Sequence, residues 1–413
     1  MKLWIINQYA SKPDTAGLTR HYEMGRRLAT KGIEVLIVHG SYDLYLKTQP
    51  ASDDLSQDNS VKISEFEGVQ FLTVPTPPYR NNRSFGRIMN MFAFRRRAYK
   101  EMASGRHGKP DMILGSTMTL SGADAARRLA GLFSVPFVYE VRDLWPLSPI
   151  EIGGYSRHNP FIVYLGYLDR RLAKSADMII TTAPLMKEYY REKFDIPEER
   201  FLWIPNGTDI DIFSNNKPLV EKKGKGFDLF YTGSLGLANG LEHVFDQLGN
   251  IRKKLPGFRL VLVGDGPRRE LLRKRAKDEG FPVEFRGAVP KKDLPGILRE
   301  AEACLVYLLP SRLYRYGISL NKLADYMAAG KPVLFIGDCA ENPVLRSGSG
   351  IVVEDIEGFP NALQEMIGLD HEGRVEMGNR GRAYAEENYD WDKLSIKFAN
   401  ALEKIVSSRQ NNG

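Results

Sequence analysis

The stretch Tyr314-Arg-Tyr-Gly-Ile-Ser-Leu-Asn-Lys-Leu-Ala-Asp-Tyr-Met-Ala-Ala-Gly-Lys-Pro-Val333 says more about the fold than any other part of this 413-residue chain. A polar loop leads into an amphipathic pattern with its apolar residues at helical spacing. Gly330 predicts the end of that helix, and an apolar strand follows it. The order loop, helix, glycine and strand is typical of one unit of a parallel α/β sheet.

The start of this helix is a candidate anion site. Its first N–H groups have no partner inside the helix, and Lys322 adds a positive charge beside them. Asp325 lies one turn further on, where a carboxylate can accept hydrogen bonds from sugar hydroxyls. An ordinary capped helix with solvated charges is the alternative interpretation of the same residues.

Working outward, short apolar runs alternate with longer amphipathic ones along the whole chain, which predicts two doubly wound parallel sheets. The expected strands of the first half are Leu3–Ile6, Glu34–Val38, Val69–Val74, Met112–Leu114, Phe137–Val141, Met178–Thr181 and Phe201–Ile204. Those of the second half are Asp228–Thr232, Arg259–Val263, Val283–Phe285, Ala303–Leu308, Pro332–Phe335 and Gly350–Val353. The expected helices include Arg20–Lys31, Ala123–Leu132, Pro160–Lys174 and Trp391–Val406.

The pattern restarts after a polar stretch, which predicts two domains. We expect a first domain over residues 1–205 and a second over 206–389, with the linker in the polar region Asn206–Gly226 and the helix of residues 390–413 packing back onto the first domain. A long surface loop is expected over Ser41–Ser60. Ligands of such sheets bind at the carboxyl ends of the strands, so we expect a cleft between the domains.

Composition narrows the class of protein. The net charge of +7 is modest, and nucleic acid is a weak inference from it. The first strand begins at once, which predicts no signal peptide, and no apolar run reaches the roughly 18 residues of a membrane span. Cys304 and Cys339 lie in apolar runs and are expected to be buried thiols. We therefore expect a cytoplasmic protein.

Six further motifs accompany the opening stretch in a fixed order. They are Arg20–Glu23, Tyr139–Pro146, Ile204–Asp209, Tyr231–Gly240, Val263–Pro267 and Phe285–Pro290. With Tyr314–Val333, they resemble the family 4 glycosyltransferases, and in particular the WbuB-like O-antigen and exopolysaccharide subfamily. The resemblance covers nearly the whole chain and implies the GT-B fold of two facing Rossmann-like domains with an interdomain cleft.

The resemblance also implies a retaining, metal-independent transfer from a nucleotide sugar, with no cofactor, and we expect the donor to be UDP-linked. The family has two acidic residues at the donor site, and here Gly317 takes the first place and Asp325 the second. Ser234 and Asn239 stand where the family has Arg and Lys to hold the diphosphate. We therefore assign that role to Lys322, Arg315 and the backbone of Gly233–Gly240.

The remaining site residues follow from the same comparison. The catalytic candidates are Asp325, Lys322, Arg315, Arg142, Asp143 and His21, with Arg142 at a position where many relatives have histidine. The candidates for binding the donor are Gly17, Thr19, Gly233, Ser234, Asn239, Gly264, Gly287, Val289 and Asn321. For Gly17 and Thr19 a simple strand-to-helix loop is the alternative, and for His21 a structural role.

Two motifs are set aside. Gly264-Asp-Gly-Pro267 begins like a dinucleotide fingerprint but has Arg269 in place of the third glycine, so we do not expect NAD. Asp209 and Asp211 resemble a metal-binding pair, and we interpret them as turn and capping residues. No metal site is expected.

The segment Arg80–Lys100 interleaves seven cationic side chains with large apolar ones. A core helix with a solvated basic face and a helix that contacts an anionic membrane fit this pattern equally well. The resemblance implies a glycan or a polyprenyl-diphosphate-linked acceptor, which favours the membrane and a place at the inner face of the plasma membrane.

Three functions remain open at this point. The first is a glycosyltransferase of surface polysaccharide synthesis. The second is an epimerase or hydrolase that binds the same nucleotide sugar. The third is a basic binding protein without catalysis, which the departures at Ser234, Asn239 and Gly317 keep open.

Overall fold

The computed structural model describes residues 1–14, 19–42, 60–79, 84–214 and 226–411. The chain forms two compact units, one of Met1–Pro205 with Asp392–Gly413 and one of Asn206–Trp391. The expected linker is partly wrong, because its described part, residues 206–214, packs into the second unit through the buried Phe213 and a bridge from Thr208 to Asp390. The expected loop Ser41–Ser60 lies outside the described residues except at its ends.

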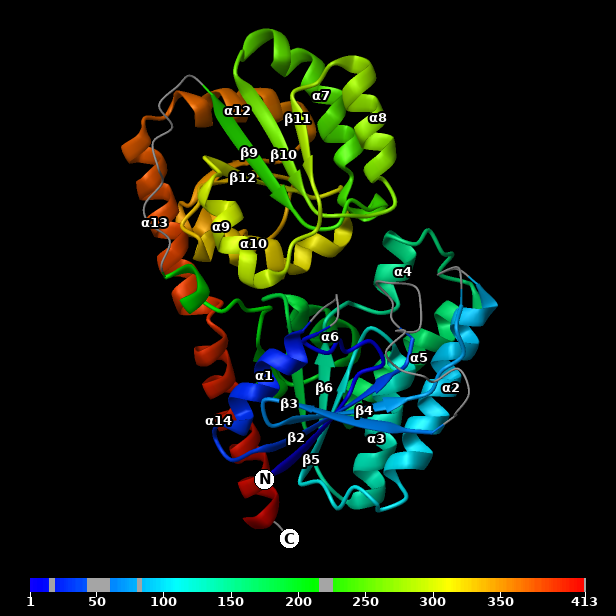
Figure 1. Cartoon of the computed structure of the whole chain (residues 1–413). Coiled ribbons are helices and arrows are strands. Elements are labelled where there is room, and N and C mark those ends of the chain that lie inside the picture. The colour runs from blue at the N-terminus through cyan, green and yellow to red at the C-terminus, as the bar shows by residue number, and fades with distance from the viewer. Residues whose placement is uncertain (15–18, 43–59, 80–83, 215–225, 412–413) are drawn as a thin grey trace. The chain divides into compact units, whose positions relative to one another are not determined.

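The first unit is built on a sheet with the strand order β3-β4-β2-β1-β5-β6-β7-β8 (Figure 1). Its strands are β1 (Lys2–Ile6), β2 (Glu34–Gly40), β3 (Lys62–Phe66), β4 (Val69–Val74), β5 (Met112–Ser116), β6 (Phe137–Val141), β7 (Met178–Thr181) and β8 (Phe201–Trp203). Only β3 pairs in the antiparallel sense, along β4. The central strands are apolar on both faces because helices cover both.

The helices of the first unit are α1 (Arg20–Ala29), α2 (Phe85–Met102), α3 (Leu120–Phe133), α4 (Leu147–Glu151), α5 (Pro160–Ser175), α6 (Met186–Phe194) and α14 (Trp391–Asn411), with the 3-10 turn η1 (Glu198–Arg200). Two of them begin or pack through clear sequence signals. Asn159 caps α5 by accepting a 2.9 Å hydrogen bond from the Phe161 N–H, and Pro160 opens the helix. Gly115 on β5 lets α3 approach, since a Cβ there would lie 2.8 Å from the Ala126 Cβ.

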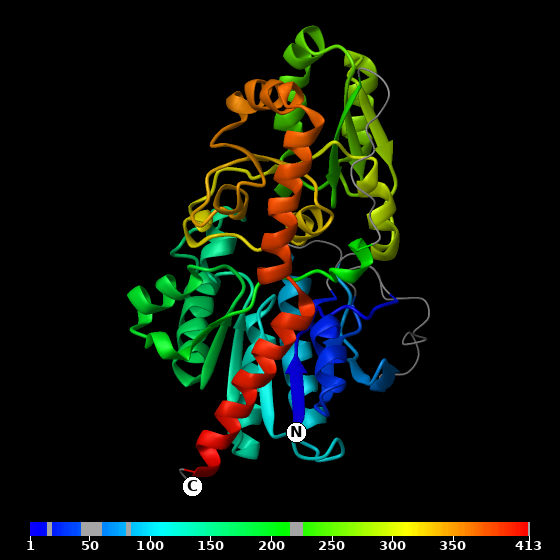
Figure 2. The same cartoon turned by 90° about the vertical axis from the view of Figure 1, so that its left-hand side faces the viewer.

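The C-terminal helix α14 completes the first unit (Figure 2). Its residues Leu394, Phe398 and Leu402 are buried, and Asp392 forms an ion pair with Arg27 of α1. The Lys397 ammonium donates a 3.0 Å hydrogen bond to the carbonyl of Trp203. Residues far apart in sequence therefore build one core.

The second unit has six parallel strands in the order β11-β10-β9-β12-β13-β14. They are β9 (Phe227–Thr232), β10 (Phe258–Val263), β11 (Val283–Arg286), β12 (Ala303–Tyr307), β13 (Val333–Ile336) and β14 (Gly350–Val353). The helices are α7 (Leu241–Lys254), α8 (Arg269–Glu279), α9 (Leu294–Arg299), α10 (Asn321–Ala328), α11 (Pro343–Ser347), α12 (Phe359–Gly368) and α13 (His371–Asn388). Short 3-10 turns are η2 (Asp211–Phe213), η3 (Leu237–Asn239), η4 (Lys291–Asp293), η5 (Arg312–Tyr316) and η6 (Ile356–Gly358).

Side chains of the second sheet alternate between two cores. Leu229 and Tyr231 of β9 pack with α7, α8 and α12, whereas Phe230 between them packs with α9 and α10 on the opposite face. This alternation is what a strand period of two requires of a sheet covered on both sides.

The predicted fold class of two Rossmann-like α/β domains is confirmed. The strand β3 was missed, because its residues alternate in exposure at the sheet edge and carry no continuous apolar run. Within the described residues, the helices are all too short or too polar to cross a bilayer.

Candidate functional site

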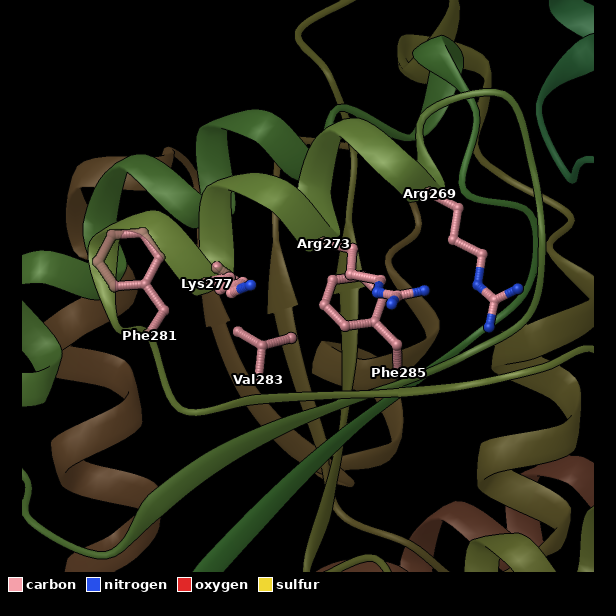
Figure 3. A pocket seen from close by; sticks show the side chains of 7 residues that line it. Arg269, Arg273, Lys277, Phe281, Val283 and Phe285 are labelled. Carbon is pink, nitrogen blue, oxygen red and sulfur yellow. The ribbon is translucent and has the colours of Figure 1, made fainter.

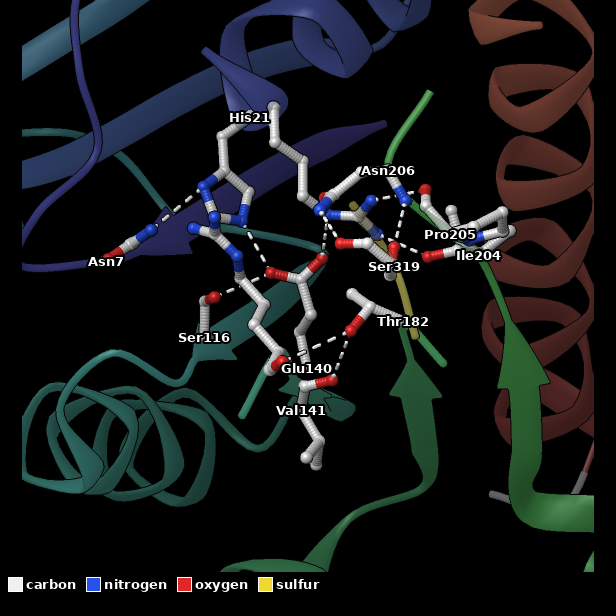
Figure 4. A network of polar contacts seen from close by, with 12 residues as sticks. Asn7, His21, Ser116, Glu140, Val141, Thr182, Ile204, Pro205, Asn206 and Ser319 are labelled. Carbon is white, nitrogen blue, oxygen red and sulfur yellow. Dashed lines mark hydrogen bonds and ion pairs between the residues drawn. The ribbon is translucent and has the colours of Figure 1, made fainter. Parts of the chain in front are cut away.

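A buried ionic network lies at the carboxyl ends of β1, β5 and β6 in the first unit (Figure 4). Its centre is Glu140 on β6, which is buried and accepts from three side chains. The Arg20 Nε lies 2.8 Å from one carboxylate oxygen. The His21 Nε2 and the Ser116 Oγ lie 2.7 Å and 2.6 Å from the other. Parallel strands end together at this edge, which brings these polar residues into contact.

The charges within the network are balanced. Burial alone would raise the pKa of Glu140, but Arg20 and His21 lower it well below its usual range. The Arg20 guanidinium also donates to the carbonyls of Ile204 at 2.8 Å and Pro205 at 2.6 Å. The network therefore anchors the segment that follows β8, at Ile204 and Pro205, to the start of α1.

His21 was predicted at the catalytic centre, with a structural role as the alternative, and the structure places it inside this network. The Asn7 amide nitrogen lies 3.0 Å from His21 Nδ1, and the Asn7 amide oxygen accepts from the Tyr9 N–H. The Nδ1 atom must therefore accept, and Nε2 carries the proton that is donated to Glu140. Burial lowers the pKa of His21, which agrees with a neutral ring. Both ring nitrogens of His21 are therefore engaged within the first unit.

Arg142 and Asp143 follow β6 directly. Both backbone N–H groups approach the Thr117 Oγ1, at 2.7 Å and 3.3 Å, while the two side chains remain partly exposed. Burial raises the pKa of the Asp143 carboxyl, and the neighbouring Arg142 opposes this shift. The side chains are thus held at the same sheet edge as Glu140.

Gly17 lies outside the described residues. Thr19 precedes α1, and its carbonyl accepts a 2.8 Å hydrogen bond from the Glu23 N–H. Thr19 therefore has the place of a helix cap, which is the structural alternative that the sequence left open.

In the second unit, two glycine-containing loops press against each other. Gly264 has φ +149°, and a Cβ on it would lie 1.9 Å from the Gly233 carbonyl oxygen. A Cβ on Gly266 would lie 2.6 Å from the carbonyl oxygen of Leu235. The Gly233 N–H donates to Val263 at 2.9 Å. Packing of main chain on main chain therefore requires the glycines Gly264 and Gly266.

The backbone of Gly233–Gly240 was predicted to hold the diphosphate, and some of its N–H groups are hydrogen-bonded within the unit. The N–H groups of Gly233 and Asn239 are both engaged inside the unit, Asn239 by the carbonyl of Gly236 at 3.1 Å. In the part of the chain that the structure describes, the Ser234 N–H has no acceptor, and Ser234 is exposed. The loop thus has an N–H without an acceptor and a hydroxyl at the exposed residue Ser234.

Lys322 reaches back from α10 to this loop. Its ammonium donates a 2.7 Å hydrogen bond to the Tyr231 hydroxyl and lies 3.9 Å from the centroid of the Tyr231 ring. The Asn239 side-chain oxygen is 3.4 Å away. No carboxylate within the described residues lies at ion-pair distance from Lys322. Burial lowers the pKa of Lys322 to about 7.

Asp325 is buried one turn further along α10. One of its oxygens accepts a 2.7 Å hydrogen bond from Thr208 Oγ1 and also binds the Lys291 ammonium. The carboxylate therefore links residues 206–214 to the helix and to η4. Within the described residues, its second oxygen accepts no side-chain hydrogen bond, so it is the atom with capacity to accept from a ligand.

The other predicted residues of the second unit are at the surface. The Arg315 guanidinium lies 4.6 Å from the Tyr316 ring centroid and donates to its hydroxyl. Asn321 is the first residue of α10 and is exposed. Gly287 is exposed with open space where a Cβ would be, and Val289 is half-buried against the core.

Some residues of these clusters had no role assigned from the sequence. They are Glu140, Thr208, Tyr231 and Lys291. The first three lie inside quoted motifs, which was the available signal, and Lys291 directly follows Phe285–Pro290. Their side-chain partners are more than 20 residues away, so spacing along the chain could not reveal the contacts.

Two family models together match most of the chain. Residues 17–212 match the model described as glycosyltransferase family 4, and residues 226–368 match that of the glycosyl transferases group 1. This chain belongs to glycosyltransferase family 4. The predicted family is therefore confirmed, and the two sheets form the two halves of the GT-B fold.

This glycosyltransferase has relatives of known and putative function. It is 27% identical over 256 residues to the GDP-mannose-dependent alpha-(1-6)-phosphatidylinositol monomannoside mannosyltransferase of Mycobacterium tuberculosis, with 58% of this chain and 65% of that protein covered. It is 23% identical over 356 residues to the putative colanic acid biosynthesis glycosyl transferase WcaI of Escherichia coli, with 80% and 82% covered.

Solved structures show the same fold. HepE of Anabaena, in a crystal structure with UDP, matches with a TM-score of 0.67 at 16% identity and covers 98% of this chain and 99% of that one. At that identity the likeness concerns the fold.

A separate pocket of about 370 Å³ lies in the second unit between α8 and β11 (Figure 3). The helix α8 contributes Arg269, Arg273, Ala276 and Lys277 to its lining. The residues after α8 contribute Phe281, Val283 and Phe285. None of the predicted site residues lines this pocket. Its residue Phe285 is the first of the motif Phe285–Pro290, which also contains the predicted residues Gly287 and Val289.

Proposed function

We propose that this glycosyltransferase moves a sugar from a UDP-linked donor to a glycan or a polyprenyl-diphosphate-linked acceptor, with retention of the anomeric configuration, in the synthesis of a surface polysaccharide. We place this reaction in the cytoplasm at the inner face of the plasma membrane. The observation that carries the donor half of the proposal is the arrangement of Lys322, Tyr231 and Ser234. The Tyr231 hydroxyl joins the Lys322 ammonium to the Ser234 carbonyl, so a lysine without a carboxylate partner in the described residues lies near an exposed N–H without an acceptor, a combination that suits a diphosphate.

The chemistry follows from that arrangement. Breaking the sugar–phosphate bond leaves negative charge on the nucleoside diphosphate. The Lys322 ammonium and the Ser234 N–H are fixed donors that can stabilise this charge without any metal ion. A fixed donor of this kind contributes on the order of 3 kcal/mol to the transition state.

The likeness to HepE, which was crystallised with UDP, and to WcaI supports a UDP donor and a polysaccharide product. The mannosyltransferase relative is named for GDP-mannose, so GDP is the competing nucleotide. Calorimetric titration with UDP and GDP decides between them. Tighter binding of GDP would contradict the UDP assignment and leave the transferase assignment intact.

The reaction itself is tested by mass spectrometry of products from a panel of nucleotide sugars with and without lipid-linked acceptors, and NMR of the product gives the anomeric configuration. We expect a glycosylated acceptor. Acceptor-independent turnover would instead indicate the epimerase or hydrolase alternative. Binding of a nucleotide sugar without turnover under any condition would favour the non-catalytic protein.

A further inference from the structure

The first unit exposes large apolar side chains in one region. Of the twelve large apolar side chains that are exposed within the described residues, six lie on α2, on α5 or just after α4. They are Phe85, Met89, Phe92, Ile152, Val163 and Tyr167. Phe85 is 73% exposed and Tyr167 62% exposed. Scattered single residues of this kind are normal on a protein surface, but a concentrated group marks an interaction surface.

The helix α2 has two apolar faces. Met91, Phe94, Ala98 and Met102 are buried against the unit, as a core helix requires. Phe85, Met89 and Phe92 recur at positions i, i+4 and i+7 on the opposite face, and Arg96 and Lys100 continue the same row. The sequence left a core helix and a surface-binding helix as alternatives, and one helix here has the features of both.

The helix α5 repeats the pattern. Its exposed row is Val163, Tyr167, Arg170 and Lys174, with Arg171 beside it. Its only carboxylate, Asp169, is buried. Rows on both helices are therefore apolar in the first two turns and cationic afterwards.

The helices α2 and α5 both pack on α3 and meet through one pair of aromatic rings. The rings of Phe92 on α2 and Tyr164 on α5 have their centroids 6.3 Å apart, and Figure 1 shows both helices on the same side of the unit. Each connects two parallel strands of one sheet, so both run in the same direction. Their apolar ends and their cationic ends therefore coincide, and we call the six apolar residues with Arg96, Lys100, Arg170, Arg171 and Lys174 the α2–α5 surface.

Other cations of the segment Arg80–Lys100 are not part of the α2–α5 surface, because they have partners within the first unit or lie outside the described residues. Arg95 forms an ion pair with Asp124 at 2.5 Å, and Arg97 donates to the carbonyl of Pro75 at 2.8 Å. Arg80 and Arg83 lie outside the described residues. Of the segment Arg80–Lys100, the exposed surface thus takes only the residues of one helix face, and α5 and Ile152 supply the rest.

We propose that the α2–α5 surface binds an anionic lipid bilayer, with its aromatic and aliphatic side chains in the headgroup region and its cations on the lipid phosphates. Within the described residues, the cations of this surface form no ion pair, and together with the exposed rings they complement an anionic interface both electrostatically and through apolar contact. The proposal deepens the proposed function, because it rests on a lipid-linked acceptor as the reason for the enzyme to reach a bilayer.

The test is sedimentation of the full chain with vesicles of phosphatidylcholine alone or with phosphatidylglycerol, over a range of salt. We expect binding to the anionic vesicles at low salt and release as salt rises. The variant Arg96→Gln/Arg170→Gln/Lys174→Gln should weaken this binding by about tenfold or more, as should Phe85→Ser/Tyr167→Ser. A matched control, Lys253→Gln/Lys254→Gln/Lys274→Gln, removes the same charge from exposed positions of the second unit and should bind like the wild type.

Turnover of a water-soluble acceptor analogue separates this proposal from the proposed function, and melting curves confirm that each variant folds. Normal turnover with no vesicle binding at low salt would overturn the membrane surface alone. Vesicle binding without turnover on any donor would count against the proposed function alone. Unchanged vesicle binding by Phe85→Ser/Tyr167→Ser, together with a loss of self-association in sedimentation velocity, would assign the surface to a second copy of the chain instead.

Discussion

The Lys322 ammonium is held by Tyr231 in two ways, through a 2.7 Å hydrogen bond to the hydroxyl and through the ring face 3.9 Å away. Burial lowers the pKa of Lys322 to about 7, so the lysine is part neutral at neutral pH in the absence of a ligand. A bound diphosphate favours the charged form. Donor binding should therefore take up a proton near and above pH 7.

The variants Lys322→Met and Tyr231→Phe test this relationship. We expect UDP affinity of the wild type to fall as pH rises from about 7, whereas Lys322→Met should bind about 10–150-fold more weakly, with a flat pH profile. Tyr231→Phe keeps the ring and removes the hydroxyl, so it should shift the profile while the fold is retained. Isothermal titration in buffers of different ionisation enthalpy measures the proton uptake directly. Equal pH profiles for wild type and Lys322→Met would contradict the assignment.

The substitution Asp325→Ala should raise the donor KM and lower kcat/KM by about 10–150-fold, because it removes an acceptor for sugar hydroxyls. Because buried Thr208 loses its partner, the structure adds an expected loss of roughly 1–3 kcal/mol of stability. Thr208→Val is the matched control, which should lose stability and keep the donor kinetics. Equal kinetic losses in both variants would show that Asp325 acts only through Thr208.

Turnover should survive chelation of divalent ions. The proposed charge stabilisation comes from Lys322 and the Ser234 N–H, which are part of the chain. Initial rates with and without EDTA measure this, with a dialysed sample restored by Mg²⁺ or Mn²⁺ as the control. Complete loss of turnover that either metal reverses would transfer the role to an ion.

The pH dependence of stability should report Asp169. This carboxyl accepts from the hydroxyls of Tyr139 at 2.8 Å and Tyr190 at 2.9 Å, and its other oxygen is buried without a partner in the described residues. Burial raises the pKa of Asp169 to about 7. Its contribution to folding is therefore complete below the unfolded pKa of about 3.9 and is lost as pH rises through 7.

We expect Asp169→Asn, which cannot ionise, to have a smaller decrease in the free energy of unfolding between pH 5 and pH 8 than the wild type. The difference between the two slopes should be on the order of a few kcal/mol. Urea unfolding at several pH values measures it. Parallel curves for the two proteins would mean that Asp169 does not titrate in this range.

The sequence was informative where local pattern decides structure. Val69–Val74, Phe137–Val141, Met178–Thr181 and Gly350–Val353 have the bounds that their apolar runs predict. The edge strand Lys62–Phe66 was missed because half of its residues are polar and its identity depends on pairing with β4.

Contacts between distant residues were beyond such reasoning. The spacing of residues along the chain predicts neither the hydrogen bond of Thr208 to Asp325 nor that of Lys322 to Tyr231. Each forms only when the second unit is folded. The glycines show the same limit. Gly264 resembled a ligand loop, whereas its requirement comes from the Gly233 carbonyl against which it packs.

The return of α14 to the first unit has a consequence for synthesis of the chain. Leu394, Phe398 and Leu402 belong to a core whose other residues are translated before residue 206. At about 5–20 residues per second, the ribosome needs on the order of 10–40 s to make residues 206–391. Throughout that interval the nascent first unit lacks the apolar side chains of α14, whereas the second unit is one continuous segment of the chain. The half translated first is therefore the half completed last.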